Sequence, residues 1–344
     1  LRWYNLNINK RYMPWRSTND PYKIWLSEIM LQQTQVKTVI PYYNKWIKKY
    51  PTLESVAKSN IDDLLKIWEG LGYYSRCRNF HKSSIKIFQD YNGKIPEDFD
   101  QFKELPGVGE YTAGAVLSIA FGKKIPAIDT NILRVMSRIL GLKERSKSNL
   151  SKIKINMIDY LNTERPGDIN QALMDFGAMI CKNKDPVCKN CIFQDICKAW
   201  EVGDPEGYPA KNKKAAAKKI LMSSGILVDD ELILIVKKKN GIYREMWQFP
   251  SISTKSSIKE NLIKKKFKEE FGIKIKSMKL IGSFNHLLSH RNINVKVFSI
   301  EARKTLIESK DFKWIKAKNL NSLPLPNLDK RVFKLFHNYR NDSK

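Results

Sequence analysis

Four closely spaced cysteines constrain this chain more than any other feature of its sequence. They form the pattern C-x6-C-x2-C-x5-C, at Cys181, Cys188, Cys191 and Cys197. A structural zinc site usually joins two close pairs of ligands across a longer spacer, whereas here a single Cys-x2-Cys pair has a long arm on each side. Four thiolates in this pattern favour a larger group. We interpret them as ligands of a [4Fe–4S] cluster, with zinc or free thiols as alternatives.

The cysteine count also bears on the cellular compartment. Five cysteines are an odd number, and the crowding of four of them is typical of metal binding in a reducing compartment rather than of a disulfide framework. The fifth, Cys77, stands alone, and we expect a buried, inert thiol. We expect a cytoplasmic, nucleoid-associated protein if the source is bacterial, and a nuclear or mitochondrial one if it is eukaryotic.

The charge of the chain points to an anionic partner. Its 344 residues include 62 Lys and Arg against 35 Asp and Glu, a net charge of +27, and this balance is typical of proteins that bind a polyanion. Hydrophobic residues make up 42%, which is enough for cores and excludes global disorder. The longest apolar runs fall well short of the ~20 residues that a membrane span needs, so we expect no membrane association.

Two changes in pattern divide the chain. Residues 1–203 show apolar side chains at helical spacing, residues 204–219 are rich in Gly, Pro and Lys and predict a linker, and residues 220–344 contain strand-like runs of Ile and Val. The expected fold is multidomain: an all-α domain that carries the cysteine loop at 181–197, then a smaller α+β domain. The predicted strands are 220–228, 231–238 and 294–301, with a helix at 257–271.

One helix of the first domain is predicted to begin at Asp20-Pro21, where an N-cap side chain is followed by proline in the first turn. Its apolar stripe is predicted to be Trp25, Ile29, Val36 and Ile40. The other predicted helices are 61–70, 73–91, 110–121, 131–140 and 169–180.

A glycine-rich connection lies between two of these predicted helices, in Leu105-Pro106-Gly107-Val108-Gly109. Its two glycines let backbone N–H groups approach an anion closely, and the helix that begins at Glu110 directs its N-terminus to the same place. A tight connection without a ligand is the alternative. The charge of the chain and the downstream cysteines favour contact with DNA phosphates through Gly107, Val108 and Gly109.

Two carboxyl side chains are candidates for chemistry. Glu28 is flanked on its helix by Ile24 and Leu31, so we expect burial to raise its pKa and keep it protonated near neutral pH. Asp129 precedes a predicted helix, where such a side chain can serve as an N-cap and nothing more. The pattern alone leaves a catalytic and a structural role open for both residues.

The hairpin, Asp129 beyond it and the cysteine pattern together resemble the helix-hairpin-helix DNA glycosylases of the endonuclease III superfamily. Three further segments are similar to the MutY branch of that superfamily, the adenine DNA glycosylases with a C-terminal Nudix-like domain. The segments are Met13-Pro14-Trp15-Arg16, Ser27-Glu28-Ile29-Met30-Leu31-Gln32-Gln33-Thr34 and Gly70-Leu71-Gly72-Tyr73-Tyr74-Ser75-Arg76. The resemblance is dense over residues 8–200 and looser over residues 220–335.

The resemblance implies an enzyme of base excision repair that removes adenine mispaired with 8-oxoguanine or G. Adenine cannot be reached inside a duplex, so such an enzyme flips it into a pocket. Glu28 would protonate adenine N7, Asp129 would stabilise the positive sugar that forms, and Asn131 would hydrogen-bond near both acids. Arg16 and Gln171 would line the adenine pocket. The other residues implied to contact DNA are Gln33, as a wedge beside the lesion, Thr34, Leu71 and Tyr73.

Tyr111 separates two subclasses within this resemblance. Glycosylases that also cut the strand carry at this position a lysine whose amine forms a Schiff base with the sugar, and a phenol cannot do so. Tyr111 therefore predicts a monofunctional hydrolase without efficient lyase activity, with water as the final nucleophile. Thr130 departs from the glycine usual in the MutY branch, which leaves a glycosylase that removes thymine from T·G pairs as the alternative.

The C-terminal domain resembles the Nudix-like domain that reads 8-oxoguanine on the opposite strand. Met246-Trp247-Gln248-Phe249-Pro250 fits an early strand, and Lys265-Lys266-Phe267-Lys268-Glu269-Glu270-Phe271-Gly272 resembles a Nudix box whose Arg-Glu pair has become Lys-Lys. Loss of that Glu predicts a retained fold without Mg²⁺-dependent hydrolysis. Leu288-Ser289-His290 takes the place of a Phe-Ser-His loop. Ser289 and His290 are therefore implied to contact 8-oxoguanine, while Leu288 removes an aromatic wedge.

The expected partner is double-stranded DNA that contains A·8-oxoguanine or A·G mispairs, bound by a monomer with a [4Fe–4S] cofactor. A DNA-binding module without catalysis, or a cluster-bearing damage sensor, is the alternative from another functional class, because the charge and the hairpin would serve binding alone. Retention of both Glu28 and Asp129 favours the enzyme.

Overall fold

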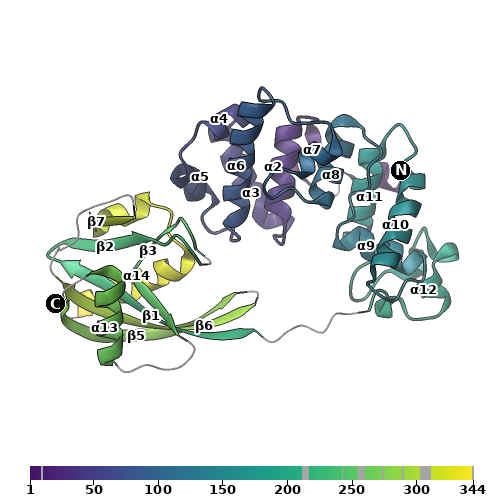
Figure 1. The fold of residues 1–344 in the computed structure, drawn as a ribbon. Coiled ribbons are helices and arrows are strands. Elements are labelled where there is room, and N and C mark those ends of the chain that lie inside the picture. The colour runs from purple at the N-terminus through teal and green to yellow at the C-terminus, as the bar shows by residue number, and fades with distance from the viewer. Residues whose placement is uncertain are drawn as a thin grey trace. The chain divides into compact units, whose positions relative to one another are not determined.

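The computed structural model of the chain contains two compact units (Figure 1). One comprises Leu1–Ser59 with Ser75–Lys213 and is helical, and the other comprises Asn60–Tyr74 with Lys214–Lys344 and is built around a β-sheet. The predicted fold class, a helical domain followed by a smaller domain of mixed helix and strand, is confirmed. The structure describes residues 1–8, 11–210, 217–241, 243–254, 260–272, 275–288, 290–302 and 311–342.

Short helices follow one another through the first unit. The predicted helices at 73–91, 110–121, 131–140 and 169–180 are confirmed, with small shifts at their ends. The helix at 110–121 ends where predicted because Gly122 adopts a left-handed conformation (φ 66°) that favours glycine. The helices of this unit are α1 (Arg2–Asn7), α2 (Pro21–Leu31), α3 (Val36–Lys49), α4 (Leu53–Ala57), α6 (Ser75–Asp90), α7 (Phe99–Lys103), α8 (Glu110–Phe121), α9 (Thr130–Ile139), α10 (Lys147–Tyr160), α11 (Pro166–Met179) and α12 (Lys198–Glu201).

Helix α2 begins as predicted but ends early. The Asp20 side chain accepts a hydrogen bond from the Tyr22 N–H (2.9 Å) and caps the helix. The helix stops at Leu31, and two residues later the backbone of Gln33 has a left-handed conformation (φ 57°). The prediction of one apolar stripe that continues through Val36 and Ile40 was therefore wrong, because these two residues belong to α3.

Packing of α8 against both α2 and α11 sets the geometry of the first unit. On one side the ring of Trp25 contacts Phe80 and Phe102, with centroids 4.4 and 5.5 Å apart. On the other side, buried residues of α9, α10 and α11 form a separate core cluster that includes Ile132 and Phe176. Burial of large apolar side chains contributes about 1.5–3 kcal/mol each, so these clusters hold the helices that carry the site.

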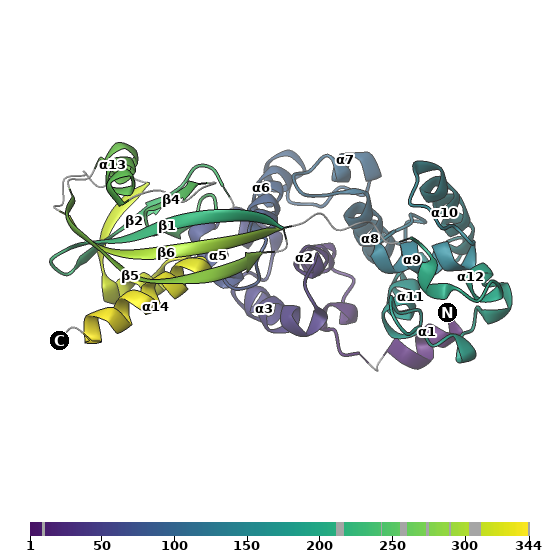
Figure 2. The same cartoon turned by 90° about the horizontal axis from the view of Figure 1, so that it is seen from below.

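In the described part of the second unit, seven strands form one sheet with the order β3-β2-β1-β6-β5, in which β4 pairs with β1 and β7 pairs with β2. β1 runs parallel to β6, and the other pairs are antiparallel. Helices α13 and α14 lie against opposite faces (Figure 2). The elements are β1 (Lys218–Asp229), β2 (Leu232–Lys237), β3 (Trp247–Gln248), β4 (Ser251–Thr254), β5 (Ile275–Leu288), β6 (Arg291–Ala302), β7 (Phe312–Lys316), α5 (Ile61–Trp68), α13 (Glu260–Phe271) and α14 (Asn327–Asp342).

The predicted elements of this unit are present: the strands at 220–228, 231–238 and 294–301 are β1, β2 and β6, and the helix at 257–271 is α13 from Glu260 onward. Residues 257–259 lie outside the described part of the chain. The sequence did not predict β5, whose alternating exposed and half-buried residues carry a weaker apolar signal than the buried strands. The last residues of the predicted linker, from Lys218, already belong to β1.

The second unit also contains the segment Asn60–Tyr74, which is distant in sequence from the sheet. Asp62 of this segment accepts hydrogen bonds from Lys237 Nζ (2.7 and 2.8 Å) and from Trp247 Nε1 (3.1 Å). The helix at 61–70 was predicted, but its place in this unit was not. Among the described residues, no helix has the length and apolarity required to cross a membrane.

Candidate active site

One pocket of the first unit collects most of the residues predicted to act on DNA. Its volume is about 1090 Å³, and it is lined from the 3-10 turn η2 (Pro14–Ser17), α2, α8, α11 and the start of α9. A pocket of this size accommodates a planar base together with its sugar. The predicted residues that line it are Arg16, Glu28, Gln33, Thr34, Gly107, Gly109, Tyr111, Asp129, Asn131 and Gln171.

Glu28 lies within α2 and is only 6% exposed. Burial raises the pKa of its carboxyl to about 7, while a hydrogen bond from the Tyr111 hydroxyl to Glu28 Oε2 and the nearby charge of Arg16 act in the opposite direction. Near neutral pH a substantial fraction of Glu28 therefore keeps its proton, as its apolar neighbours predict. Burial and the neighbouring Glu28 raise the pKa of Tyr111 far above its usual value, so the phenol remains a hydrogen-bond donor.

Asp129 is the N-cap of α9. Its Oδ1 accepts a hydrogen bond from the Ile132 N–H and its Oδ2 accepts one from Asn131 Nδ2, each 2.7 Å long. Partial burial raises the pKa of Asp129, and these donors counteract that rise. The capping role that the sequence left open is thus present, and the same carboxyl lines the pocket. Asp129 also lies close enough to Glu28 for its charge to raise the pKa of Glu28.

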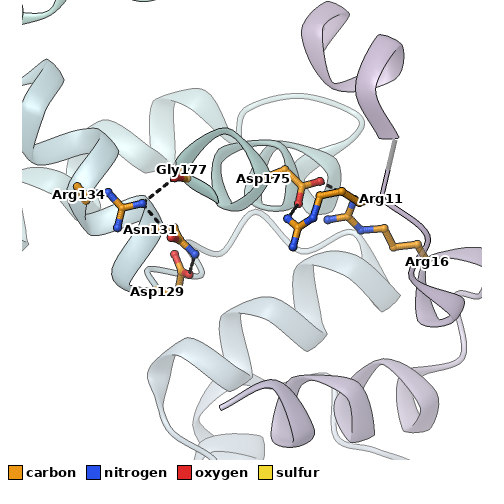
Figure 3. A network of polar contacts seen from close by, with 7 residues as sticks. All are labelled: Arg11, Arg16, Asp129, Asn131, Arg134, Asp175 and Gly177. Atoms are coloured by element: carbon orange, nitrogen blue, oxygen red, sulfur yellow. Dashed lines mark hydrogen bonds and ion pairs between the residues drawn. The ribbon is translucent and has the colours of Figure 1, made fainter. Parts of the chain in front are cut away.

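Asn131 joins Asp129 to Arg134 in one polar network (Figure 3). Its Oδ1 accepts a hydrogen bond from Arg134 Nη2 (3.0 Å), which also donates to the Gly177 carbonyl (2.7 Å), while Arg134 Nε donates to the Cys181 carbonyl (2.8 Å). Gly177 packs tightly here, since a Cβ at this position would lie 2.7 Å from Asn131 Cβ. The sequence did not single out Arg134, which joins the side chain beside Asp129 to the first cysteine of the loop.

The four cysteines of the predicted cluster line a single small cavity together with Arg138. The Cys181 Sγ accepts a hydrogen bond from Arg138 Nη1 (3.3 Å). Burial raises the pKa of Cys188 and Cys191, and the charges of the other cysteines raise it further. Within the described ranges, no three His, Cys, Asp or Glu side chains are grouped to hold a single metal ion.

A second ion network on the pocket wall was not predicted. Asp175 of α11 accepts hydrogen bonds from Arg11 Nη1 (2.8 Å) and Arg16 Nη1 (2.5 Å), as Figure 3 shows. All three residues line the pocket. A sequence signal for Asp175 existed, because it lies one helical turn beyond Gln171 and hence on the same face of α11.

The loop between α2 and α3 carries Gln33 and Thr34, and Arg76 anchors it. The guanidinium of Arg76 donates to the carbonyls of Ile29, Met30 and Gln32 at 2.7–2.8 Å, and to Thr34 Oγ1 at 3.2 Å. These bonds satisfy carbonyl groups at the end of α2. Gln33 itself is exposed and has a left-handed backbone, a conformation that costs energy outside glycine and often marks a functional position.

The hairpin between α7 and α8 has the predicted form. Gly107 adopts a left-handed backbone (φ 82°), and a Cβ there would lie 2.8 Å from Asn79 Cβ, so glycine is required on both counts. Gly107 and Gly109 are exposed, whereas the Val108 side chain is buried and its N–H donates to the Leu105 carbonyl (3.0 Å). The exposed glycines, rather than Val108, present the accessible backbone of this turn.

Four predicted DNA contacts lie in the second unit. Tyr73 is 40% exposed and has a left-handed backbone (φ 47°), whereas Leu71 is 6% exposed. His290 is exposed in the turn between β5 and β6, and its carbonyl accepts a hydrogen bond from the Lys218 N–H (3.0 Å). Ser289 lies outside the described residues.

The Nudix-like box falls on α13. Its Phe267 and Phe271 are buried in the core against the sheet. Glu269 and Glu270 are exposed and face lysines, with Glu270 Oε1 lying 3.2 Å from Lys238 Nζ. The apolar positions of the box thus serve the fold, and its two carboxylates are paired with cations.

Family models describe both parts of the chain. Residues 26–156 match the HhH-GPD superfamily of base excision DNA repair proteins, and residues 224–335 match the NUDIX domain. The first match contains Glu28, the hairpin and Asp129, and the second contains the sheet from the middle of β1 onward and α13.

Some adenine DNA glycosylases align with nearly the full length of this chain, and others with its first part. An adenine DNA glycosylase of Buchnera aphidicola subsp. Baizongia pistaciae is 34% identical over 331 residues, which cover 95% of this chain and 92% of that protein. The human adenine DNA glycosylase is 38% identical over 210 residues, which cover 58% of this chain and 38% of the human protein. Among solved structures, a thermostable thymine-DNA glycosylase has 31% identity and a TM-score of 0.52, and the match covers 57% of this chain and 91% of that one.

Proposed function

This chain belongs to the adenine DNA glycosylase family, and on that premise we propose that it flips adenine out of a mispair with 8-oxoguanine or G and hydrolyses its bond to deoxyribose. The comparisons support a DNA glycosylase of base excision repair, with DNA as its partner. The net charge of +27 is consistent with a phosphate backbone as the binding surface. Such an enzyme works where the cell keeps its DNA.

The observation that carries this proposal is the pair of unlike carboxyl groups in one pocket. Glu28 has a pKa raised to about 7 and accepts one hydrogen bond from Tyr111. Asp129 accepts bonds from a backbone N–H and a side-chain amide. Removal of a purine requires a proton donor for the leaving base and a negative charge beside the sugar, and these two environments provide one of each.

The reaction then follows from these two positions. With adenine in the pocket, Glu28 donates its proton to N7, and the electrons of the C1′–N9 bond move to the departing base. The sugar acquires positive charge at C1′, which the Asp129 carboxylate on the pocket wall stabilises. Water adds to C1′, and the proton that it loses returns to the Glu28 carboxylate, so the products are free adenine and an abasic site, and Glu28 is again protonated.

The pocket contains a phenol where a lyase needs an amine. Tyr111 donates its hydrogen to Glu28, and an oxygen nucleophile does not form a Schiff base with the sugar. We therefore expect a monofunctional hydrolase. Product DNA should stay intact until it is heated with base, and borohydride should trap no covalent complex. Trapping at the level of a lysine-dependent lyase would contradict this part of the proposal.

The four cysteines fit a [4Fe–4S] cluster. All four line one cavity, and the single Cys-x2-Cys pair with a long arm on each side favours a polynuclear group over zinc. Such a cluster, when bound, would cross-link the loop from Cys181 to Cys197, and Arg138 would donate to one of its ligands. Protein purified without oxygen should contain about four irons per chain, and stoichiometric zinc in place of iron would overturn the assignment.

We assign recognition of 8-oxoguanine, the base opposite the adenine, to Ser289 and His290. His290 is exposed at the tip of the β5–β6 hairpin, and 8-oxoguanine differs from guanine by the O8 acceptor and the N7–H donor. A hydrogen bond contributes ~0.5–1.5 kcal/mol net, so the double alanine variant should lose about tenfold in its preference for A·8-oxoguanine over A·G. An unchanged preference in this variant would show that the second unit recognises a feature of the DNA other than 8-oxoguanine.

A thymine glycosylase is the second candidate, because a thymine-DNA glycosylase shares the fold of the first unit at 31% identity. The NUDIX match and the adenine DNA glycosylase relatives over more than 90% of the chain favour adenine. Single-turnover cleavage of A·8-oxoguanine, A·G and T·G duplexes decides between them. We expect the first to be cut fastest and the last to stay intact. Preferred cleavage of T·G would establish the second candidate, and DNA binding with no cleavage would establish a non-catalytic module.

A further inference from the structure

Asp175 has a place in the pocket that neither proton transfer nor charge stabilisation explains. It is 4% exposed, and each of its two oxygens accepts a hydrogen bond from a different arginine, Arg11 and Arg16. Its partner Arg16 is also mostly buried, with 11% of its side chain exposed. Burial of a carboxylate is costly unless charged donors compensate it, so this ion network holds all three side chains in defined positions.

Arg16 is the critical member of this network because it lies near the proton donor. Its positive charge favours the ionised form of Glu28, against the effect of burial. The other groups that face Glu28 are Tyr111 of α8, which donates to it, and Asp129 at the start of α9, whose negative charge favours the protonated form. A guanidinium fork binds a carboxylate well whenever it can reach one. Apart from Asp175, Arg16 lies over the ring of Tyr4, 5.7 Å from its centroid, and its charge acts on Glu28, which lines the same pocket. Without Asp175, no carboxylate compensates that charge before it acts on Glu28.

We propose that Asp175 is a positioning residue that holds Arg16 against α11 and away from Glu28, so that Glu28 keeps the proton it must donate. This inference rests on the function proposed above. It adds a residue that controls the protonation of the proton donor. Arg16 must stand on the wall of the pocket to contact a base, but its charge opposes the protonation of Glu28. Asp175 resolves the conflict because it both orients Arg16 and compensates its charge.

A second aspartate on the same helix provides the matched control. Asp168 also pairs with an arginine, Arg165, with Arg165 Nη2 2.6 Å from Asp168 Oδ2. This pair is more exposed, at 46% and 28% of the two side chains, and neither member lines the pocket that contains Glu28. Asp168 Oδ1 also accepts a hydrogen bond from Gln171 Nε2 (3.5 Å), and asparagine keeps this acceptor oxygen. Asp168→Asn therefore removes the charge of an Arg–Asp pair from α11, and the arginine that it releases lies outside the pocket that contains Glu28.

The test is the pH dependence of single-turnover adenine removal in Asp175→Asn, with enzyme in excess over DNA. In the wild type the rate should fall as pH rises through about 7. In Asp175→Asn the half-maximal point should move down by about 1–3 pH units, the effect of an opposite charge near a carboxyl. The plateau at low pH should change less, and Asp168→Asn should keep the wild-type profile.

Two double variants complete the experiment. In Arg16→Gln/Asp175→Asn the profile should match that of Arg16→Gln alone, because Asp175 acts through Arg16. Should Asp175→Asn fail to fold with two unpaired arginines, Arg11→Gln/Asp175→Asn removes one of them and should still show the downward shift. An unshifted profile in the folded Asp175 variant, or an equal shift without Arg16, would overturn the inference. Absence of adenine removal by the wild type would instead refute the proposed function.

Discussion

The two walls of the pocket hold the same functional group in opposite environments. On α2, Glu28 is buried, has the apolar residues Ile24 and Leu31 beside it on its own helix, and accepts one side-chain hydrogen bond, from Tyr111. At the start of α9, Asp129 accepts bonds from a backbone N–H and from Asn131. Burial raises the pKa of both, but only Asp129 has donors on both of its oxygens to oppose it.

The difference follows from position along a helix. Within α2 the backbone N–H groups are already bonded to carbonyls of the preceding turn, so Glu28 finds no backbone donor. At a helix N-terminus the first N–H groups have no such partner, so Asp129 receives one. A carboxyl within a buried helix is thus suited to hold a proton, and one at an N-cap is suited to remain charged.

The largest effect is expected from Glu28→Gln, which keeps the shape of the side chain and removes its proton. General acid catalysis contributes about 10²–10⁴-fold, so the single-turnover rate should fall at least a hundredfold, while DNA binding stays nearly unchanged. Glu110→Gln is the matched control, since Glu110 is exposed on α8 and paired with Lys154 at 2.6 Å. A Glu28→Gln rate above about 10% of wild type would remove Glu28 from its role.

Asp129→Asn should have the next largest effect. Asparagine caps a helix about as well as aspartate, so the free energy of unfolding should change by less than about 1 kcal/mol. Removal of the charge beside the sugar should still lower the single-turnover rate by about 10²-fold. Thermal unfolding and kinetics measured on the same protein separate the two roles. A fall in stability with a wild-type rate would show that Asp129 is an N-cap and nothing more.

Of these substitutions, Tyr111→Phe should have the smallest effect on the rate. It should increase the difference between Glu28 and Asp129 in how strongly each carboxyl holds its proton. The Tyr111 hydrogen bond favours ionised Glu28, so its loss should raise the pKa of Glu28. The pH at which activity falls should then move upward by about one unit, the equivalent of one hydrogen bond of ~0.5–1.5 kcal/mol. Tyr43→Phe, at a buried tyrosine of α3 that does not line the pocket, should leave the profile unchanged. A downward shift in Tyr111→Phe would contradict the account.

Local signals explain which parts of the fold the sequence could predict. The helix at 110–121 was predicted with its correct ends because glycine stands at both of them. The end of α2 at Leu31 was missed, because it depends on Arg76, whose bonds to the α2 carbonyls join residues far apart in sequence. The place of the segment Asn60–Tyr74 in the second unit likewise depends on Asp62 meeting Lys237, which no local pattern contains.

The residues of the site also divide into those predicted from local sequence and those whose role depends on contacts between distant segments. The apolar neighbours of Glu28 within its own helix were sufficient to predict a raised pKa. Asp175 and Arg134 were not predicted, because their roles appear only when α11 packs against the N-terminal segment and α9 against the cysteine loop. Helical spacing places Asp175 on the same face of α11 as Gln171, but no local pattern names Arg11 and Arg16 as its partners.

The protonation state of Glu28 is the central claim, and the pH dependence of the wild-type single-turnover rate tests it most directly. A group that must be protonated to act supports full activity below its pKa and loses it above. The rate of adenine removal should therefore be constant at low pH, reach half its maximum near pH 7 and fall about tenfold for each further unit. A rate that stays constant or rises between pH 6 and pH 9 would contradict the account.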